Sequence, residues 1–210
     1  GNLYTVGDTE ELFTIQSTCK PILYIMALME KGLVEVQDHI GEEPSGQPFD
    51  ALSIDPMNRA FNPYVNAGAI TSMSLLGGSA EERYKSFESY CKAIALKPSR
   101  LQLNRDVYKS EMSTNAKNQA IAAELKKRRI VEGDAMEALD AYTQACSLNT
   151  SAVDAAVMGA TLANSGKNPL SSEQVLPPDL VNQMVTVMMS CGMYNGAGKW
   201  IVDVGIPAKS

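Results

Sequence analysis

Apolar residues recur at three- and four-residue intervals along most of the chain, a spacing typical of amphipathic helices. The clearest case begins at Ile22 and ends at Lys31, where Gly32 follows as a stop signal. The same spacing predicts further helices near 67–76, 110–128, 151–164 and 178–190. Capping patterns mark the start of two more helices, Ser79 with Glu82 and Asp134 with Glu137. The basic run KKRR at 126–129 most simply ends a helix.

Strand-like patterns occur only at the two ends of the chain. They are NLYTV at residues 2–6 and WIVDV at residues 200–204. A helical body between two terminal strands predicts that the ends pair in one antiparallel sheet, with the helices packed against it. We therefore expect an α+β fold and a single domain over residues 1–210.

Composition narrows the function classes. The chain has 210 residues, of which 45% are apolar and 20% charged, so it is long enough to bury a substantial core. Its net charge of -6 provides no basic surface for nucleic acid. No apolar run approaches the roughly 18 residues that cross a bilayer, and no targeting segment opens the chain. We expect an intracellular protein, cytoplasmic or mitochondrial, that binds neither nucleic acid nor membrane.

Cysteine and histidine exclude further chemistry. Cys19, Cys91, Cys146 and Cys191 lie far apart, with no CxxC pair. This spacing favours reduced, mostly buried thiols over a zinc site or a disulfide framework. His39 is the only histidine, and we expect it in a solvated turn after the first helix. A catalytic triad built on histidine is therefore disfavoured, and no metal site or cofactor is predicted.

The polar start of the first helix, QSTCK at 16–20, offers a catalytic alternative. Ser17 and Lys20 are three residues apart and lie on one helix face. A neutral lysine can remove the proton of a serine hydroxyl where no histidine is available. Burial and the positive end of the helix would both lower the pKa of that lysine. On this motif alone, a serine helix cap beside a solvated lysine is the favoured interpretation.

Other motifs widen the comparison to the whole chain. In order, they are QSTCKP, EEPSG, FNPYVNAGAI, SEMSTNAKN, LDAYTQACSL, TLANSGKNP, SCGMYNGAG and VGIPAKS. Their order and spacing resemble those of the serine-dependent glutaminases of bacteria and animal mitochondria. That family shares the fold of serine β-lactamases and penicillin-binding transpeptidases. The resemblance implies hydrolysis of L-glutamine to L-glutamate and ammonia through a serine acyl-enzyme.

The resemblance also implies roles for individual residues. Ser17 matches the family nucleophile and Lys20 its base, while Tyr194 lies close to this pair and relays a proton or positions Lys20. The residues that match the substrate site are Gln16, Asn66, Glu111, Asn118, Tyr142 and Tyr194. A carboxylate suits the α-ammonium of an amino acid, and amide donors suit its α-carboxylate. A homodimer or homotetramer, with inorganic phosphate as a possible activator, also follows from the resemblance.

The sequence departs from the family pattern in several places. Lys117 stands where an arginine usually precedes the substrate asparagine, and Tyr64 replaces a methionine. Family members also carry an earlier strand with a substrate-binding tyrosine. After PAKS they continue into a glycine-rich turn that supplies the second oxyanion donor, so we expect the chain to be a fragment of the catalytic domain.

Two other functions stay open at this stage. A β-lactamase or transpeptidase would need a Ser-x-Asn or Tyr-x-Asn element and a final Lys-Thr-Gly or Lys-Ser-Gly, and YVN at 64–66 and KS at 209–210 are compatible with these. A non-catalytic module would use the helical body as a docking surface. Release of ammonia from glutamine, hydrolysis of a lactam, or neither would distinguish the three.

Overall fold

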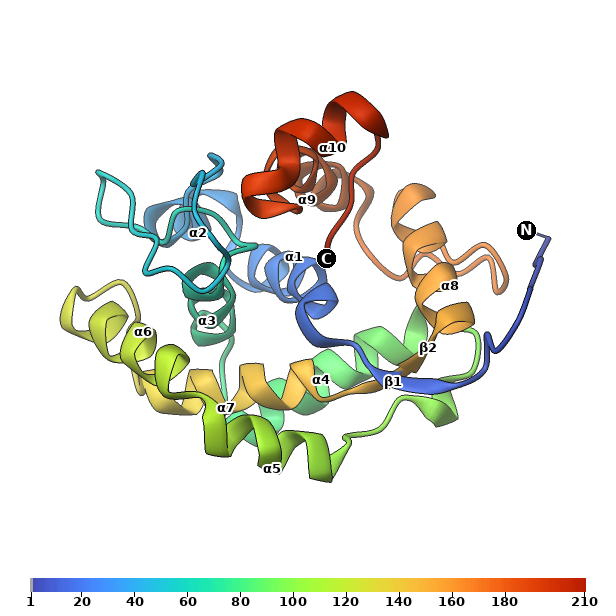
Figure 1. The fold of residues 1–210 in the computed structure, drawn as a ribbon, viewed down its shortest axis with the longest axis horizontal. Helices are drawn as coiled ribbons and strands as arrows, with labels where there is room; N and C mark the ends of the chain where they lie inside the picture. The colour runs from blue at the N-terminus through green and yellow to red at the C-terminus, as the bar shows by residue number, and fades with distance from the viewer. Residues whose placement is uncertain (1) are drawn as a thin grey trace.

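A computed structural model describes residues 2–210, and helices form most of it (Figure 1). In the labels used here, η denotes a short 3₁₀ helix. The elements are β1 (Leu12–Thr14), η1 (Gln16–Cys19), α1 (Lys20–Lys31), α2 (Leu33–His39), α3 (Asn66–Ser74), α4 (Ala80–Ala93), η2 (Pro98–Arg100), α5 (Arg105–Thr114), α6 (Ala116–Lys127), α7 (Ala135–Cys146), β2 (Asn149–Ser151), α8 (Ala152–Ala163), α9 (Pro178–Cys191), η3 (Tyr194–Gly196) and α10 (Ala197–Asp203).

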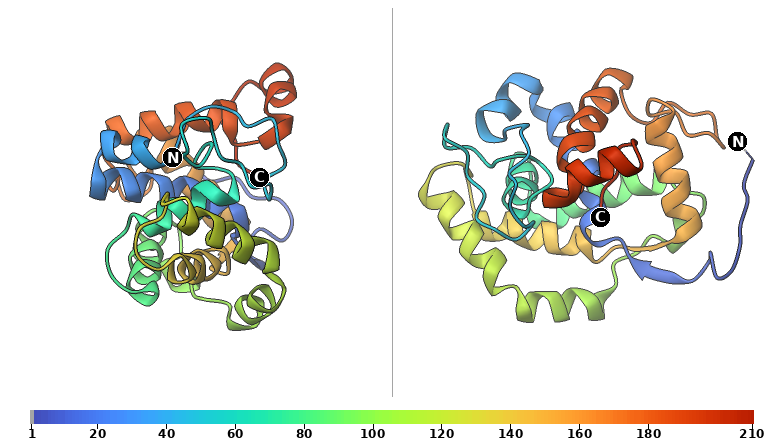
Figure 2. Two further views of the ribbon diagram at one scale, coloured as in Figure 1. Left: turned by 90° about the vertical axis from the view of Figure 1, so that its left-hand side faces the viewer. Right: turned by 45° about the horizontal axis from the view of Figure 1, so that its top comes forward.

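Helix α1 lies in the middle of the body, with the other helices arranged around it (Figures 1 and 2). Every residue from Lys20 to Leu28 is buried. Helices α3, α4 and α9 contact α1, which explains why a helix in this position needs apolar residues on all sides. Pro21 lies in its first turn, and Gly32 ends it with φ 78°. The helix predicted from this stretch is confirmed.

The sheet is small and consists of β1 and β2. The two strands are antiparallel, with Leu12 opposite Ser151 and Thr14 opposite Asn149. The mostly helical body with this sheet confirms the α+β class, but the predicted strands are wrong. Residues 2–6 form no strand and are exposed. Residues 200–203 belong to α10, where Lys199 and Asp203 form an ion pair one helical turn apart.

The other helix predictions are confirmed with one change. Helices α3, α8 and α9 match the predicted ranges, whereas the range 110–128 contains two helices, α5 and α6, that meet at Asn115. Ser79 and Glu82 form the expected capping box. The Asp134 side chain caps α7 by accepting the backbone N–H of Met136. Within residues 2–210, no helix combines the length and the apolar character that a membrane span requires.

The environments of His39 and the cysteines test two further predictions. His39 does not lie in a loop, because it occupies the last turn of α2 and its Nδ1 atom is 2.7 Å from the carbonyl oxygen of Ile130. This contact involves none of the candidate site residues. All four cysteines are free and buried, as predicted.

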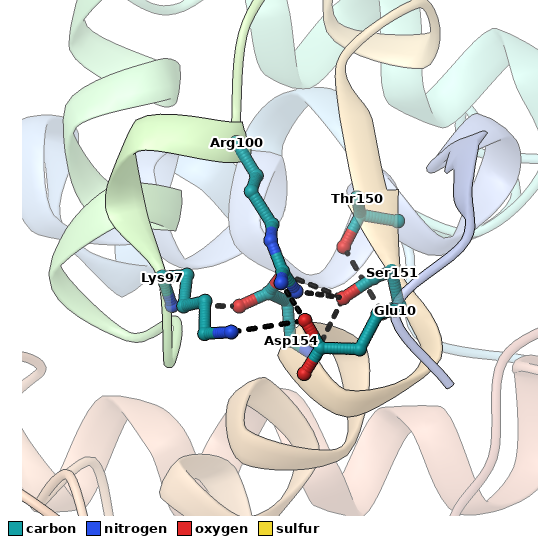
Figure 3. A network of polar contacts seen from close by, with 6 residues as sticks. All are labelled: Glu10, Lys97, Arg100, Thr150, Ser151 and Asp154. Carbon is teal, nitrogen blue, oxygen red and sulfur yellow. Dashed lines mark hydrogen bonds and ion pairs between the residues drawn. The ribbon is translucent and has the colours of Figure 1, made fainter. Parts of the chain in front are cut away.

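A polar network connects the segment before β1 to the start of α8 (Figure 3). Asp154 is fully buried, and its carboxylate accepts the backbone N–H of Lys97 at 2.8 Å and the Ser151 hydroxyl at 2.6 Å. Arg100 lies 3.7 Å from Asp154 and also pairs with Glu10. Because buried carboxylates are stable only with such partners, the network fixes the ends of the β1–β2 pair that leads into η1.

Candidate active site

The turn η1 places Ser17 at the entrance of α1. The backbone N–H of Ile15 donates to the Leu148 carbonyl at 2.8 Å, which ties the turn to the end of α7. Gln16 has φ 49°, a conformation that non-glycine residues adopt only when the surrounding structure enforces it. Ser17 is half-buried and Lys20 follows three residues later, as the sequence spacing predicts. The sharp turn therefore brings the hydroxyl close to the buried end of the helix.

Lys20 is a fully buried amine with polar partners. Its Nζ donates to the side-chain oxygen of Asn66 at 2.8 Å and lies 3.2 Å from the hydroxyl oxygen of Tyr194. Burial lowers the pKa of Lys20 from 10.5 to about 8, and the thiols of Cys146 and Cys19 oppose this shift. The interpretation of Lys20 as a solvated lysine is therefore wrong. With this pKa, about a tenth of the amine is neutral at pH 7, and this is the form that a general base requires.

Tyr194 interacts with both predicted catalytic residues. Its hydroxyl accepts a hydrogen bond from Lys20 at 3.2 Å, and Ser17 lies near enough to lower its pKa. Burial raises the pKa of Tyr194 to about 12, so the group remains a phenol, while the contact with Ser17 acts in the opposite direction. Tyr194 has φ 54°, and the ring of Phe49 lies 5.6 Å away. The phenol thus contacts the amine of Lys20 and lines a cavity together with Ser17.

A cavity of about 130 Å³ opens beside Ser17. Five of the predicted substrate residues line it together with Ser17, and they come from η1, α3, α5, α6 and α7. They are Gln16, Asn66, Glu111, Asn118 and Tyr142. Tyr194 lines a neighbouring cavity of about 290 Å³ that Ser17 shares. The structure therefore brings together every residue that the sequence selected for this site.

Amide groups form the floor of the cavity. The side-chain N–H of Asn66 donates to the side-chain oxygen of Asn118 at 2.8 Å, while Tyr142 donates to Asn66 at 3.4 Å. On the opposite side, Gln16 donates to Glu111 at 3.4 Å. The Glu111 carboxylate is half-buried and lies at the cavity wall, where a cationic group of a ligand would find it.

The two departures from the motif pattern have local explanations. Lys117 extends away from the cavity floor and pairs with Asp50 at 2.6 Å. This pairing lowers the pKa of Asp50. Tyr64 is fully buried, and its hydroxyl donates to the Met184 carbonyl of α9 at 2.6 Å.

Several residues in or next to these two cavities were not selected from the sequence, and three of them bear on the chemistry. Phe49 lines both cavities, Cys146 lines the smaller one, and Lys209 hydrogen-bonds to the Tyr194 hydroxyl. Burial and the charge of Lys20 lower the pKa of Lys209 to about 6. Lys209 lies in the VGIPAKS motif, so this motif could have identified it as a site residue. Phe49 follows a loop that carries no periodic pattern.

A larger cleft of about 860 Å³ lies between α4, α5 and α7. Charged side chains such as Glu81, Lys85 and Arg105 line it, and it contains none of the selected residues. Its volume exceeds that of the Ser17 cavity, but the serine that lines it, Ser79, is exposed and serves with Glu82 as the N-cap of α4. The chemistry therefore favours the smaller cavity.

Comparison with known proteins identifies the family. The sequence profile described as Glutaminase matches residues 1–210. The chain belongs to the glutaminase family. It is 41% identical to a glutaminase of Corynebacterium efficiens over 214 aligned residues and 41% identical to one of Clostridioides difficile. The crystal structure of a probable glutaminase of Bacillus subtilis matches 97% of the chain and 66% of its own chain, at 37% identity and a TM-score of 0.91.

The glutaminase relatives are longer than this chain. The alignments cover all of it but only 50% of the Corynebacterium efficiens glutaminase and 69% of the Clostridioides difficile one. The likeness to solved glutaminases confirms the expected β-lactamase-like α+β fold. Among the described residues, no group of three His, Cys, Asp or Glu side chains is arranged to hold a metal ion.

Proposed function

We propose that the protein hydrolyses L-glutamine to L-glutamate and ammonia through an acyl-enzyme on Ser17, without a metal or cofactor. Membership of the glutaminase family supports the substrate, and the hydrogen bonds around Tyr194 support the mechanism. The single observation that carries the proposal is the buried Lys20–Tyr194 contact next to Ser17, beside a cavity lined by amides and one carboxylate.

The reaction begins with attack of the Ser17 hydroxyl oxygen on the side-chain carboxamide of glutamine. Its proton passes to Lys20, directly or through the Tyr194 hydroxyl that contacts both groups. Backbone N–H groups at the turn hold the oxyanion. Lys20 then returns the proton to the leaving nitrogen as ammonia departs. Water, activated by the same amine, cleaves the ester and releases glutamate.

The cavity suits the amino-acid end of the substrate. In this proposal Glu111 pairs with the α-ammonium, whereas Asn66 and Asn118 hold the α-carboxylate. Tyr142 and Gln16 complete the walls. A structurally similar protein, Mglu, is described in a glutamate form, at 36% identity and a TM-score of 0.92. A glutamate form of that protein agrees with the ligand proposed here.

Hydrolysis of a lactam is a second function that is compatible with the fold. Such an enzyme would use the tyrosine of its Tyr-x-Asn element at the reaction centre. Tyr64 is instead fully buried and bonded to Met184, and this position favours a role in packing. The half-buried Glu111 would also face a lactam that carries no ammonium to match it.

The test is ammonia release from L-glutamine by the purified protein, with L-asparagine and a chromogenic lactam as alternative substrates. Ser17→Ala should abolish ammonia release. Ser113→Ala is the control, since the Ser113 hydroxyl is exposed on α5 and bonds only to its own helix. Lactam turnover, or ammonia release that survives Ser17→Ala, would refute the proposal.

The remaining expectations concern the whole protein. We propose that residues 1–210 belong to one catalytic domain that assembles as a homodimer or homotetramer, with inorganic phosphate as activator. Light scattering and ammonia release, each measured with and without phosphate, test the assembly and its activation together. A monomer with full activity that phosphate does not change would refute both.

A further inference from the structure

Two buried thiols lie in contact directly behind the candidate catalytic group. The Sγ atoms of Cys19 and Cys146 are 3.8 Å apart. Cys19 is the last residue of η1 and immediately precedes Lys20, while Cys146 is the last residue of α7. The proposed glutamine chemistry uses neither thiol.

The two thiols differ in access. Cys146 is 8% exposed and lines the cavity beside Ser17, whereas Cys19 has no exposed surface and lies behind it. A small oxidant that enters the cavity therefore meets Cys146 first. The other two cysteines do not line this cavity, since Cys91 is buried on α4 and Cys191 on α9.

The electrostatic environments of the two thiols also make Cys146 the more reactive one. Burial raises the pKa of Cys19. The pKa of Cys146 is lowered, because the Cys19 thiol donates a hydrogen bond to it and the positive charge of Lys20 lies nearby. The thiolate is the form that reacts with oxidants. Cys146 should therefore react with the oxidant first, and Cys19 should then react with the oxidised Cys146.

We propose that Cys19 and Cys146 form an oxidation site at which a hydroperoxide closes a reversible disulfide and switches the active site off. The Cys146 thiolate attacks the peroxide oxygen, which gives a sulfenic acid and, after protonation, water. The Cys19 sulfur then displaces the sulfenic oxygen as a second water. Two thiols and one hydrogen peroxide thus become one disulfide and two waters.

Closure of the disulfide must move the catalytic lysine. The sulfur atoms have to approach from 3.8 Å to about 2.05 Å. Because Cys19 is bonded to Lys20 through the backbone, part of this movement reaches the amine and its contact with Asn66. A misplacement of about 1 Å lowers rates by about 100-fold, so oxidation should inactivate the enzyme by that order. This consequence for activity rests on the proposed function, whereas formation of the disulfide does not.

The experiment treats the reduced protein with hydrogen peroxide and follows two readouts. Peptide mass spectrometry should find a peptide pair that joins Cys19 to Cys146, with the loss of two hydrogens. Ammonia release should fall by about 100-fold and return after dithiothreitol. L-Glutamate, by filling the cavity, should slow formation of the linked peptide.

Two variants separate the roles of the thiols. In Cys19→Ala, Cys146 has no partner, so peroxide should carry it to the sulfinic acid, a gain of two oxygens that dithiothreitol does not reverse. Cys191→Ala is the matched control, because its buried thiol lies against the Glu42 carbonyl and should leave the response unchanged.

The linked peptide tests the oxidation site independently of the glutamine assay. A linked Cys19–Cys146 peptide supports the oxidation site even if the reduced protein releases no ammonia, a result that would refute the proposed function alone. Linkage of Cys19 to Cys91, no linkage, or equal recovery of Cys19→Ala and wild type after dithiothreitol would overturn it. A linked protein that keeps full activity would also overturn the switch.

Discussion

The amine of Lys20 lies 2.8 Å from the side-chain oxygen of Asn66, and this contact joins the proposed base to the proposed substrate site. Because the oxygen of Asn66 accepts from Lys20, its amide N–H faces away and donates to Asn118. The orientation of one asparagine is therefore set by the lysine on one side and the cavity floor on the other. A change at Lys20 should consequently affect binding as well as chemistry.

The pKa of Lys20 predicts the pH dependence of activity. With a pKa of about 8, only the neutral fraction can act as base, so kcat/KM should rise about tenfold per pH unit below 8 and level off above it. Lys209 titrates lower, at about 6, and Tyr194 higher, at about 12. Ammonia release measured from pH 6 to 9 at constant ionic strength checks this. A flat profile would mean that Lys20 is not the base.

The same buried amine should reduce stability. The pKa of Lys20 is lower in the folded than in the unfolded chain, so the unfolded chain binds the proton more tightly. A shift from 10.5 to about 8 corresponds to about 3 kcal/mol. This destabilisation is complete below pH 8, decreases as the pH rises, and vanishes above 10.5.

Lys20→Met should therefore stabilise the protein while it abolishes turnover. Loss of the hydrogen bond to Asn66 offsets about 1 kcal/mol, which leaves a gain of about 2 kcal/mol at pH 7. Urea unfolding of both proteins at pH 7 and at pH 10 measures the difference, which should shrink at the higher pH. A variant less stable than wild type at pH 7 would show that the charged lysine is well accommodated.

The central helix and the Ser17–Lys20 pair were predictable because their signals are local. The spacing of Ser17 and Lys20 puts both groups on one helix face wherever the helix packs. The motif resemblance then supplied Asn66, Glu111 and Asn118, which lie far apart in sequence and which no periodicity connects. The structure adds the direct contacts that sequence spacing does not contain, such as the Cys19–Cys146 pair.

The terminal strands failed as predictions for a physical reason. A short apolar run fits either a strand or a helix turn, and a strand forms only where a partner offers its backbone groups. In α10, the ion pair of Lys199 with Asp203 and the bond from the Trp200 indole N–H to the Ile206 carbonyl, 2.7 Å long, stabilise a helix instead. The actual strand β1 is only three residues long, too short to show alternation.

Glu111→Gln should weaken glutamine binding. If the carboxylate pairs with the α-ammonium, its loss removes about 2 to 5 kcal/mol, and KM should rise steeply with a smaller change in kcat. Glu81→Gln is the control, since Glu81 is exposed on α4 and pairs only with Lys85. Kinetics over a wide range of glutamine concentration give the comparison. An unchanged KM in Glu111→Gln would reduce this residue to a surface charge.

The glycine in the NAGAI motif should be intolerant of even one methyl group. Gly68 lies in the first turn of α3, and a Cβ there would be 1.9 Å from the Asn62 carbonyl oxygen. That carbonyl cannot easily move, because the Asn62 side chain accepts the backbone N–H groups of Tyr64 and Val65. Gly68→Ala should therefore cost about 3 kcal/mol and disturb Asn66 two residues away.

Gly159→Ala is the matched control for this substitution. Gly159 is also helical, in α8, but a Cβ there meets nothing within 4 Å. Alanine should therefore stabilise the protein by about 1 kcal/mol, because glycine has the lower helix propensity. Thermal unfolding of the two variants should shift in opposite directions. If both variants are stabilised, backbone propensity rather than the close approach of Gly68 to Asn62 determines the outcome.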